Sequence, residues 1–164
     1  MERCNKIISN PDYQGYLQQT GALEAKRIYC RHNFEHLLTV ARLTYILLLE
    51  NGFPYISREI AYGAGLLHDI GRWQEYTEGK DHAEASADMA DPILKEAGFT
   101  LSERSLIIKA ISQHRKKLDQ KMHRSPLSKA LSKADNLSRL CFLCTASDNC
   151  NKPDRQAHKG RLVY

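Results

Sequence analysis

The chain has 164 residues and a mass of 18.7 kDa, which suffices for one domain with a hydrophobic core but not for two. Hydrophobic residues make up 42% of it and charged residues 26%, which excludes disordered and collagen-like proteins. The net charge of +5 is uneven, because residues 1–82 carry 9 Lys/Arg against 10 Asp/Glu and residues 83–164 carry 15 against 9. The basic second half indicates an anionic partner, either a phosphate-bearing molecule or a nucleic acid.

Neither a membrane span nor an export signal is visible in the sequence. The longest strongly apolar stretch, residues 45–49, falls far short of the roughly 20 residues that cross a bilayer. The first residues have neither the apolar centre nor the cleavage site of a signal peptide. We therefore expect a cytoplasmic protein with no membrane association. Its five cysteines, an odd number, argue against a disulfide framework.

Hydrophobic residues recur at helical spacing, and no segment alternates with a period of two, which predicts an all-α bundle. In chain order, helices are expected within residues 1–30, over 34–50, from Ser57 to Gly71, from Asp81 to Gly98, from Thr100 through Ile111, and from Ser125 through Leu140. Asp91-Pro92 is expected to kink or interrupt the fourth of these. We predict a single domain over residues 1–164, with a core over about 27–143 and a polar tail over 151–164.

Several histidines and aspartates stand beside residues of the expected core. His68 and Asp69 directly follow two core leucines, and burying such a pair is costly unless both side chains are satisfied. A divalent cation satisfies both. Similar positions, each from a different helix or helix start, are His36, His82, His114 and Asp135. Histidines combined with two carboxylates suit Fe, Mn, Co or Zn.

The order of these residues resembles the HD-domain metal-dependent phosphohydrolases. The resemblance rests on His36 four residues before Val40, then on the sequences Leu-Leu-His-Asp-Ile-Gly over 66–71, His-Arg at 114–115 and Ala-Asp-Asn-Leu-Ser-Arg over 134–139. It covers about residues 27–143 and implies an HD-domain helical bundle. The residue pattern is similar in particular to that of bacterial symmetrical dinucleoside-polyphosphate hydrolases and of cyclic-nucleotide phosphodiesterases. The Gly-Tyr-Pro signature of the cyclic-di-GMP branch and the Glu-Asp step of the guanosine tetraphosphate hydrolases are missing.

The resemblance implies a metal centre and a role for each residue in it. His36, His68, Asp69 and Asp135 would bind one divalent metal, and Asp69 would bridge to a second one on His82 and His114. Two transition metals are expected, with Mg as another option. Together they would activate a water that cleaves a phosphomonoester, phosphodiester or phosphoanhydride bond of a small nucleotide-like substrate.

Catalytic and substrate-binding residues are expected around this centre. Asp69 and Asp135 would serve catalysis, with Asp135 as a proton acceptor for the attacking water. Arg72 would stabilise charge on the phosphoryl group, and the alternative for it is a surface arginine. Substrate contacts are expected from His32, Arg115, Lys133 and Arg139. His32 competes with His36 for the first ligand position, and the register of Val40-Ala41 favours His36.

Other functions stay open at this point. One is a catalytically silent metal-binding or regulatory domain that senses a nucleotide, and another is a nucleic-acid-binding helical module. Nucleic-acid binding is disfavoured, because the basic half holds only three aromatic residues for stacking, which are Phe99, Phe142 and Tyr164. The lysines and arginines over 115–133 either steer an anionic substrate or form a solvated helix face. The oligomeric state is open, with a homodimer as one option.

Cys141, Cys144 and Cys150, with His158, have a spacing that allows a structural zinc site for the C-terminal tail. The alternative is a set of reduced thiols packed on a helix that also carries Leu140 and Leu143. We favour the thiols, because one close cysteine pair with irregularly spaced partners is a weak metal motif.

Overall fold

The computed structural model describes residues 1–115 and 124–150. Within these ranges it contains eight α-helices, two short 3₁₀ helices and no strand, which confirms the expected all-α class. The helices are α1 Glu2–Ser9, α2 Pro11–Leu23, α3 Phe34–Glu50, α4 Arg58–Leu67, α5 Arg72–Glu78, α6 His82–Glu96, α7 Leu101–Gln113 and α8 Pro126–Leu137, followed by η1 Cys141–Leu143 and η2 Ser147–Asn149. No helix in the described part of the chain is long and apolar enough to cross a membrane.

The first thirty residues form two helices, where the sequence predicted one. Asn10 separates them in an extended conformation, and its side chain accepts hydrogen bonds from the backbone N–H groups of Asp12 and Tyr13. Pro11 follows in the first turn of α2, where its missing N–H costs nothing. An N-cap asparagine followed by proline is a helix start, and it divides the segment into α1 and α2.

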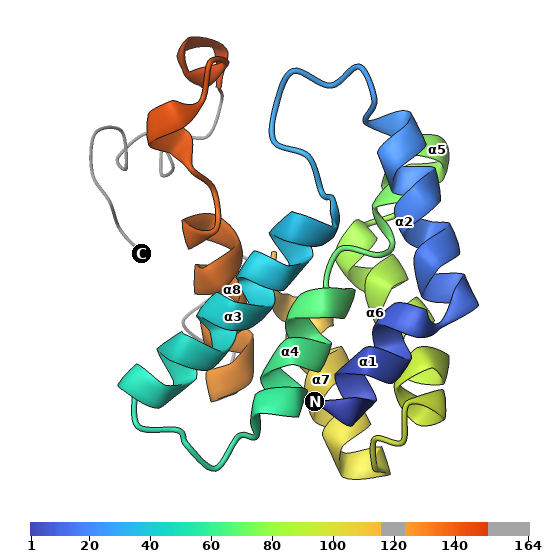
Figure 1. Cartoon of the computed structure of the whole chain (residues 1–164), viewed down its shortest axis with the longest axis vertical. Helices are drawn as coiled ribbons and strands as arrows, with labels where there is room; N and C mark the ends of the chain where they lie inside the picture. Colours follow the sequence, from blue (N-terminus) through green and yellow to red (C-terminus); the bar gives the residue numbers. More distant parts are fainter. Residues whose placement is uncertain (116–123, 151–164) are drawn as a thin grey trace.

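Helices α3 and α4 cross closely at the centre of the molecule (Figure 1). The crossing depends on Gly65, since a Cβ atom there would lie 2.3 Å from Cα of Ala41. Leu37 and Leu48 of α3 and Leu67 of α4 are fully buried in the same core. This close approach brings the N-terminal end of α3 to the C-terminal end of α4, which carry His36 and His68 respectively.

The middle of the chain differs from the prediction in two respects. Helix α4 ends at Leu67, and residues after it turn and enter the short helix α5, which the hydrophobic pattern did not indicate because none of its residues is buried. Helix α6 is continuous through Pro92, so of the two expected alternatives, a kink or an interruption, the interruption is wrong. A proline removes only one backbone donor, and the buried side chains of Ile93 and Leu94 hold the rest of α6 against the core.

The predicted helix caps are in place. Ser57 accepts a hydrogen bond from the N–H of Ile60, and Asp81 accepts from two N–H groups in the first turn of α6. Thr100 and Glu103 form a complete capping box at the start of α7. Ser125 accepts from the N–H of Ser128 and begins α8. These side chains set the helix starts at which several site residues lie.

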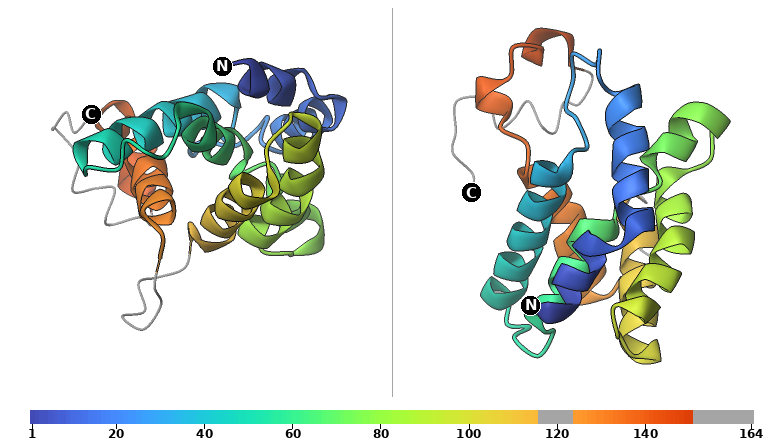
Figure 2. Two further views of the ribbon diagram at one scale, coloured as in Figure 1. Left: turned by 90° about the horizontal axis from the view of Figure 1, so that it is seen from below. Right: turned by 45° about the vertical axis from the view of Figure 1, so that its right-hand side comes forward.

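Helix α8 is shorter than expected, because it ends at Leu137 and not at Leu140. Leu140 and Leu143 are largely exposed, so no core contact extends the helix past Ser138. Residues 138–150 instead run beside the segment 24–33, at one end of the bundle (Figure 2). Two hydrogen bonds join these segments: Arg139 Nη1 donates to the carbonyl of Arg31 at 2.7 Å, and the Tyr29 hydroxyl donates to the carbonyl of Asn149 at 3.4 Å.

Candidate metal centre

Five elements bring the histidines and aspartates singled out in the sequence to one place. His36 lies in the first turn of α3, His68 and Asp69 directly follow α4, His82 is the first residue of α6, His114 directly follows α7, and Asp135 lies near the end of α8. The four histidines and Asp69 are all buried. The N-cap of α3 helps to position His36, since the Asn33 side chain accepts a hydrogen bond from the backbone N–H of His36.

Four of these side chains form a first group of potential ligands. One ligand atom from each of His36, His68, Asp69 and Asp135 lies within 4.8 Å of all the others. Nε2 of His68 is 3.2 Å from Oδ2 of Asp69, and Nε2 of His36 is 3.4 Å from Oδ1 of Asp135. We call these four residues group A.

A second group lies on the other side of Asp69. It contains Asp69 again, together with His82 and His114, within the same limit of 4.8 Å. Nε2 of His82 is 3.1 Å and Nε2 of His114 is 3.8 Å from Oδ1 of Asp69. We call these three residues group B. Asp69 therefore presents Oδ2 to group A and Oδ1 to group B.

Hydrogen bonds at Nδ1 orient three of the rings in the same manner. His68 Nδ1 lies 2.8 Å from the carbonyl oxygen of Gly65, and His114 Nδ1 lies 2.7 Å from that of Ile111. His82 Nδ1 lies 2.8 Å from Oε2 of Glu75. The two carbonyl oxygens accept only, so Nδ1 of His68 and of His114 carries a proton and Nε2 faces the centre. Nδ1 of His82 contacts both the Glu75 carboxylate and, at 3.2 Å, Nη1 of Arg115, and its Nε2 also faces the centre.

His36 reaches the same arrangement through a hydroxyl group. The Ser138 hydroxyl donates to the carbonyl of Asp135 at 2.8 Å, so its oxygen accepts from His36 Nδ1 at 3.2 Å. Nε2 of His36 is then an acceptor, and it receives a hydrogen bond of 2.9 Å from Nη2 of Arg139. All four rings thus direct Nε2 toward the two carboxylates.

Buried polar atoms without a hydrogen-bond partner indicate whether these residues fit a metal. Among the described residues, Nε2 of His68, His82 and His114 and Oδ2 of Asp69 are buried without a hydrogen-bond partner. Lone pairs that converge on a carboxylate repel one another, and burying such atoms unpaired is costly. A divalent cation in each group would satisfy all of them, so the residues fit a metal centre. Imidazole and carboxylate donors are the set that Fe, Mn, Co and Zn accept.

The protonation states also suit metal binding. Burial alone would raise the pKa of the Asp69 carboxyl, but the Arg72 guanidinium and the His68 ring hold it well below its usual value. Burial and, to a smaller extent, the nearby His68 ring lower the pKa of His114 to about 4. Metal ligands must be deprotonated, and both side chains meet that condition at neutral pH.

Comparison with known proteins identifies the family. The family model described as HD domain matches residues 33–140. The chain belongs to the HD domain family. An uncharacterized protein of Clostridium beijerinckii is 33% identical over 156 residues, which cover 95% of this chain and 96% of that protein.

A solved structure is also similar to this HD domain. It comes from an uncultured Thermotogales bacterium and is described as a predicted HD superfamily hydrolase. The two share 27% identity with a TM-score of 0.59, and the match covers 77% of this chain and 65% of that one. The matched family region, 33–140, contains every residue of groups A and B.

Arginine residues border group B of the HD domain. Arg72 Nε donates to Oδ1 of Asp69 at 3.2 Å, and its Nη1 donates to Oε2 of Glu75 at 2.7 Å. Arg115 Nη1 donates to Oε1 of Glu75 at 2.7 Å, and 44% of its side chain is exposed. Glu75 therefore links both arginines to His82. Arg72 contacts Asp69 directly, and Arg115 contacts both Glu75 and, at 3.2 Å, Nδ1 of His82.

On the other side, His32 lies beside group A without joining it. Its Nε2 is 3.8 Å from Oδ2 of Asp69, so the ring that the sequence assigned to the substrate side borders the centre directly. Glu24 holds this ring in place: its Oε1 accepts from His32 Nδ1 and its Oε2 accepts from the His32 backbone N–H at 2.7 Å. The Tyr76 hydroxyl donates to Oε1 of Glu24 at 2.6 Å.

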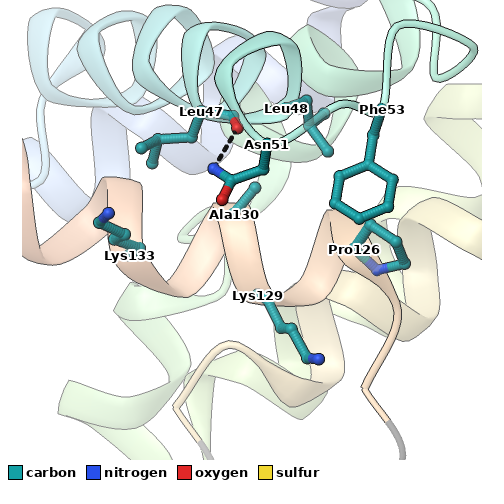
Figure 3. Close-up of a pocket in the computed structure, with 8 residues that line it drawn as sticks. All are labelled: Leu47, Leu48, Asn51, Phe53, Pro126, Lys129, Ala130 and Lys133. Atoms are coloured by element: carbon teal, nitrogen blue, oxygen red, sulfur yellow. Dashed lines mark hydrogen bonds between the residues drawn. The ribbon is translucent and has the colours of Figure 1, made fainter.

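Lys133 is the one expected substrate contact that the structure does not bring to the centre. Its exposed side chain lines a separate pocket of about 130 Å³ with Lys129, Leu47 and Phe53, between the end of α3 and the start of α8 (Figure 3). Asp135 lies on another face of α8, because a step of two residues turns a helix by more than half a turn.

Several other expectations concern residues near the C-terminus. Cys141, Cys144 and Cys150 are half-buried, and none belongs to group A or B, the two sets of described residues that could hold an ion. The expected helix beneath Cys141 and Cys144 is instead the short η1 and its flanking turn. Outside the described residues lie Lys116, Lys117, Lys121 and the tail over 151–164 with His158.

The sequence prediction missed the acceptors that orient the rings. Glu24 and Glu75 lie outside every hydrophobic pattern, and Ser138 follows the last helix as a short polar residue. Glu75 had one available signal, since it stands three residues after Arg72 and such spacing pairs charges on a helix. Glu24 had none, because the chain between it and His32 is irregular.

Proposed function

We propose that this HD domain protein is a metal-dependent phosphohydrolase that cleaves a phosphate ester or anhydride bond of a small nucleotide-like substrate. The observation that carries the proposal is the division of one buried carboxylate between two donor groups, with Oδ2 of Asp69 facing His68 and Oδ1 facing His82. A carboxylate placed in this way can bridge two cations, and two-metal centres support in-line displacement at phosphorus.

His36, His68, Asp69 and Asp135 would hold one divalent metal, and Asp69, His82 and His114 the other. Fe, Mn, Co or Zn suit these donors best, and Mg is the alternative. When bound, such cations make water a nucleophile at neutral pH and withdraw charge from the phosphoryl oxygens.

The chain's own side chains would orient the reactants. Burial would raise the pKa of the Asp135 carboxyl, but the adjacent His36 ring, whose Nε2 lies 3.4 Å from Oδ1, lowers it strongly, so Asp135 is ionised and can accept a proton from the attacking water. Arg72 already donates to Asp69 and would extend its remaining donors to a phosphoryl oxygen. Arg139, His32 and, farther out, Arg115 would contact the rest of the phosphate.

A partly exposed aromatic rim supports a nucleotide-like substrate. Tyr29 and Tyr76 are 40% and 37% exposed, and the Arg27 guanidinium lies 5.9 Å from the centre of each ring. Tyr76 connects to the centre through Glu24 and His32. Rings and a guanidinium at the edge of a phosphate site would stack on a base or another planar group.

The test is phosphate release from a panel of nucleotides and aryl phosphate esters with Mn, Co, Ni or Mg. The parent protein should turn over at least one of them. Asp69→Ala should lose nearly all bound metal, and His68→Ala should abolish turnover while the helical circular dichroism signal stays close to the parent's. Asp88→Ala, which removes an exposed carboxylate of α6, should leave metal content and turnover unchanged. A protein that binds metal and nucleotide but turns over nothing would instead be a regulatory domain.

A further inference from the structure

One side chain already engages an atom that group A needs for a metal. Arg139 lies two residues after α8, and its side chain is only 7% exposed. Its Nη2 donates a hydrogen bond of 2.9 Å to Nε2 of His36 and lies 3.9 Å from Oδ1 of Asp135. The guanidinium is permanently charged, so a cation of the chain itself lies against two of the four donors of group A.

The direction of this hydrogen bond follows from the chemistry of the guanidinium, which has five N–H donors and no acceptor. Nε2 of His36 therefore uses its lone pair to accept from Arg139. An imidazole nitrogen binds a metal ion through the same lone pair. Arg139 and a metal ion are thus alternative partners of His36, and each excludes the other.

A second donor of Arg139 ties the guanidinium to the edge of the centre. Nη1 donates to the backbone carbonyl of Arg31 at 2.7 Å, and this contact involves no atom of group A. Release of Nη2 from His36 would therefore leave Nη1 in place and keep the guanidinium beside the centre. A charged N–H group released there would favour an anionic acceptor such as a phosphate oxygen.

We propose that Arg139 competes with a metal ion for Nε2 of His36 and, once released from it, donates to a phosphate oxygen of the substrate. The same side chain would then weaken metal binding and strengthen substrate binding. Arg139 would reach phosphate only after His36 has released it, so the metal would load before the substrate. This inference rests on the proposed function and adds an order of binding to it.

Calorimetric titration of chelator-treated protein with Mn tests the competition. His114→Ala serves as the background, because it removes a donor of group B and leaves all four donors of group A. In that background Arg139→Gln should bind Mn about 10-fold more tightly, since no charge-assisted hydrogen bond has to be broken. Arg31→Gln is the matched control, because it removes an exposed charge but keeps the carbonyl that holds Arg139. It should change the Mn affinity by less than about 2-fold.

Titration of inorganic phosphate into the Mn-loaded protein tests the second part of the proposal. Arg139→Gln should bind phosphate about 10-fold more weakly than the parent, because a charged donor is lost. In chelator-treated protein the same substitution should leave phosphate binding unchanged, since Arg139 is engaged with His36 there. One substitution thus has effects of opposite sign on two ligands, which a general loosening of the fold would not produce.

Three results would overturn the inference. In the first, Arg139→Gln binds Mn no more tightly than its His114→Ala background. In the second, Arg31→Gln tightens Mn binding as much as Arg139→Gln, so that the effect is one of net charge. In the third, Mn-loaded Arg139→Gln binds phosphate as tightly as the parent. A parent protein that binds no Mn would instead overturn the proposed function itself.

Crystals of the parent protein test the exchange without any substitution. After chelator treatment, Nη2 of Arg139 should lie within hydrogen-bond distance of Nε2 of His36. After a soak in Mn, His36 should bind the ion and Arg139 should have moved away from it. An ion bound by the other three residues of group A, with Arg139 still on His36, would overturn the inference whatever the titrations show.

Discussion

His82 contacts Asp69 through the carboxylate oxygen that His68 does not use. Nε2 of His82 lies 3.1 Å from Oδ1, and Nε2 of His68 lies 3.2 Å from Oδ2. The two rings come from α6 and from the end of α4, so one carboxylate joins two otherwise separate parts of the bundle. This division makes the two donor groups separable by mutation.

Glu75→Gln should weaken the second metal without affecting the first. Glu75 accepts from His82 Nδ1 and so fixes the ring, and the loss of such a partner typically lowers metal affinity by about 10- to 100-fold. Calorimetric titration with Zn or Mn should show one tight site as in the parent and one weakened site. Glu78→Gln, on the same helix but exposed, should keep both affinities. Equal weakening of both sites would show that the groups are not independent.

His114→Ala should keep about one metal per chain and lose most phosphate release. The substitution removes one of the three donors of group B and leaves all four donors of group A in place. Elemental analysis of protein purified without chelator gives the stoichiometry, and circular dichroism checks the fold. Retention of two metals would remove His114 from the centre.

Gly65→Ala should destabilise the protein and loosen the centre. The new Cβ would overlap the backbone of Ala41, and separating α3 from α4 costs roughly 1–3 kcal/mol and moves His36 away from His68. Thermal unfolding and metal titration measure the two effects. Gly21→Ala, in an open position on α2, is the matched control and should stabilise by up to about 1 kcal/mol. If Gly65→Ala were as stable as this control, the close crossing would not exist in solution.

Glu24 should make the protein sensitive to acid. Its pKa is about 2 in the folded state against 4.5 ordinarily, because the hydrogen bonds with His32 and Tyr76 outweigh the effect of burial. As the pH falls below about 4.5 the unfolded chain takes up this proton first, so the stabilisation present above pH 4.5 is lost toward pH 2. Chemical denaturation from pH 5 to pH 2.5 should therefore show a shallower loss of stability for Glu24→Gln than for the parent. Identical slopes would contradict the low pKa.

Much of the fold follows from local signals in the sequence. The helix over 34–50 has exactly the predicted bounds, because Asn33 caps its start and a strong apolar stripe ends at Asn51-Gly52. The starts set by Ser57, Thr100 and Ser125 were also predicted, since each depends on one polar side chain. Helix α5 was not, because it buries no residue and so has no periodic pattern.

The candidate ligands of the centre were predictable from the sequence, whereas the residues that orient them were not. The family resemblance and the order of residues along the chain predicted that six side chains would lie near one another. These are His36, His68, Asp69, His82, His114 and Asp135. The sequence did not reveal Glu24 and Glu75, because a residue that orients a ring is defined by a contact between segments. Lys133 shows the converse, since nearness to Asp135 in the sequence did not place it near the centre.

In the proposed centre, the Asp69 carboxylate serves two metals. Anomalous diffraction from crystals soaked in Mn would locate each ion. We predict two ions that share Asp69, one bound by His36, His68 and Asp135 and the other by His82 and His114. A single ion, with His82 and His114 turned away from it, would show that Asp69 serves one metal only.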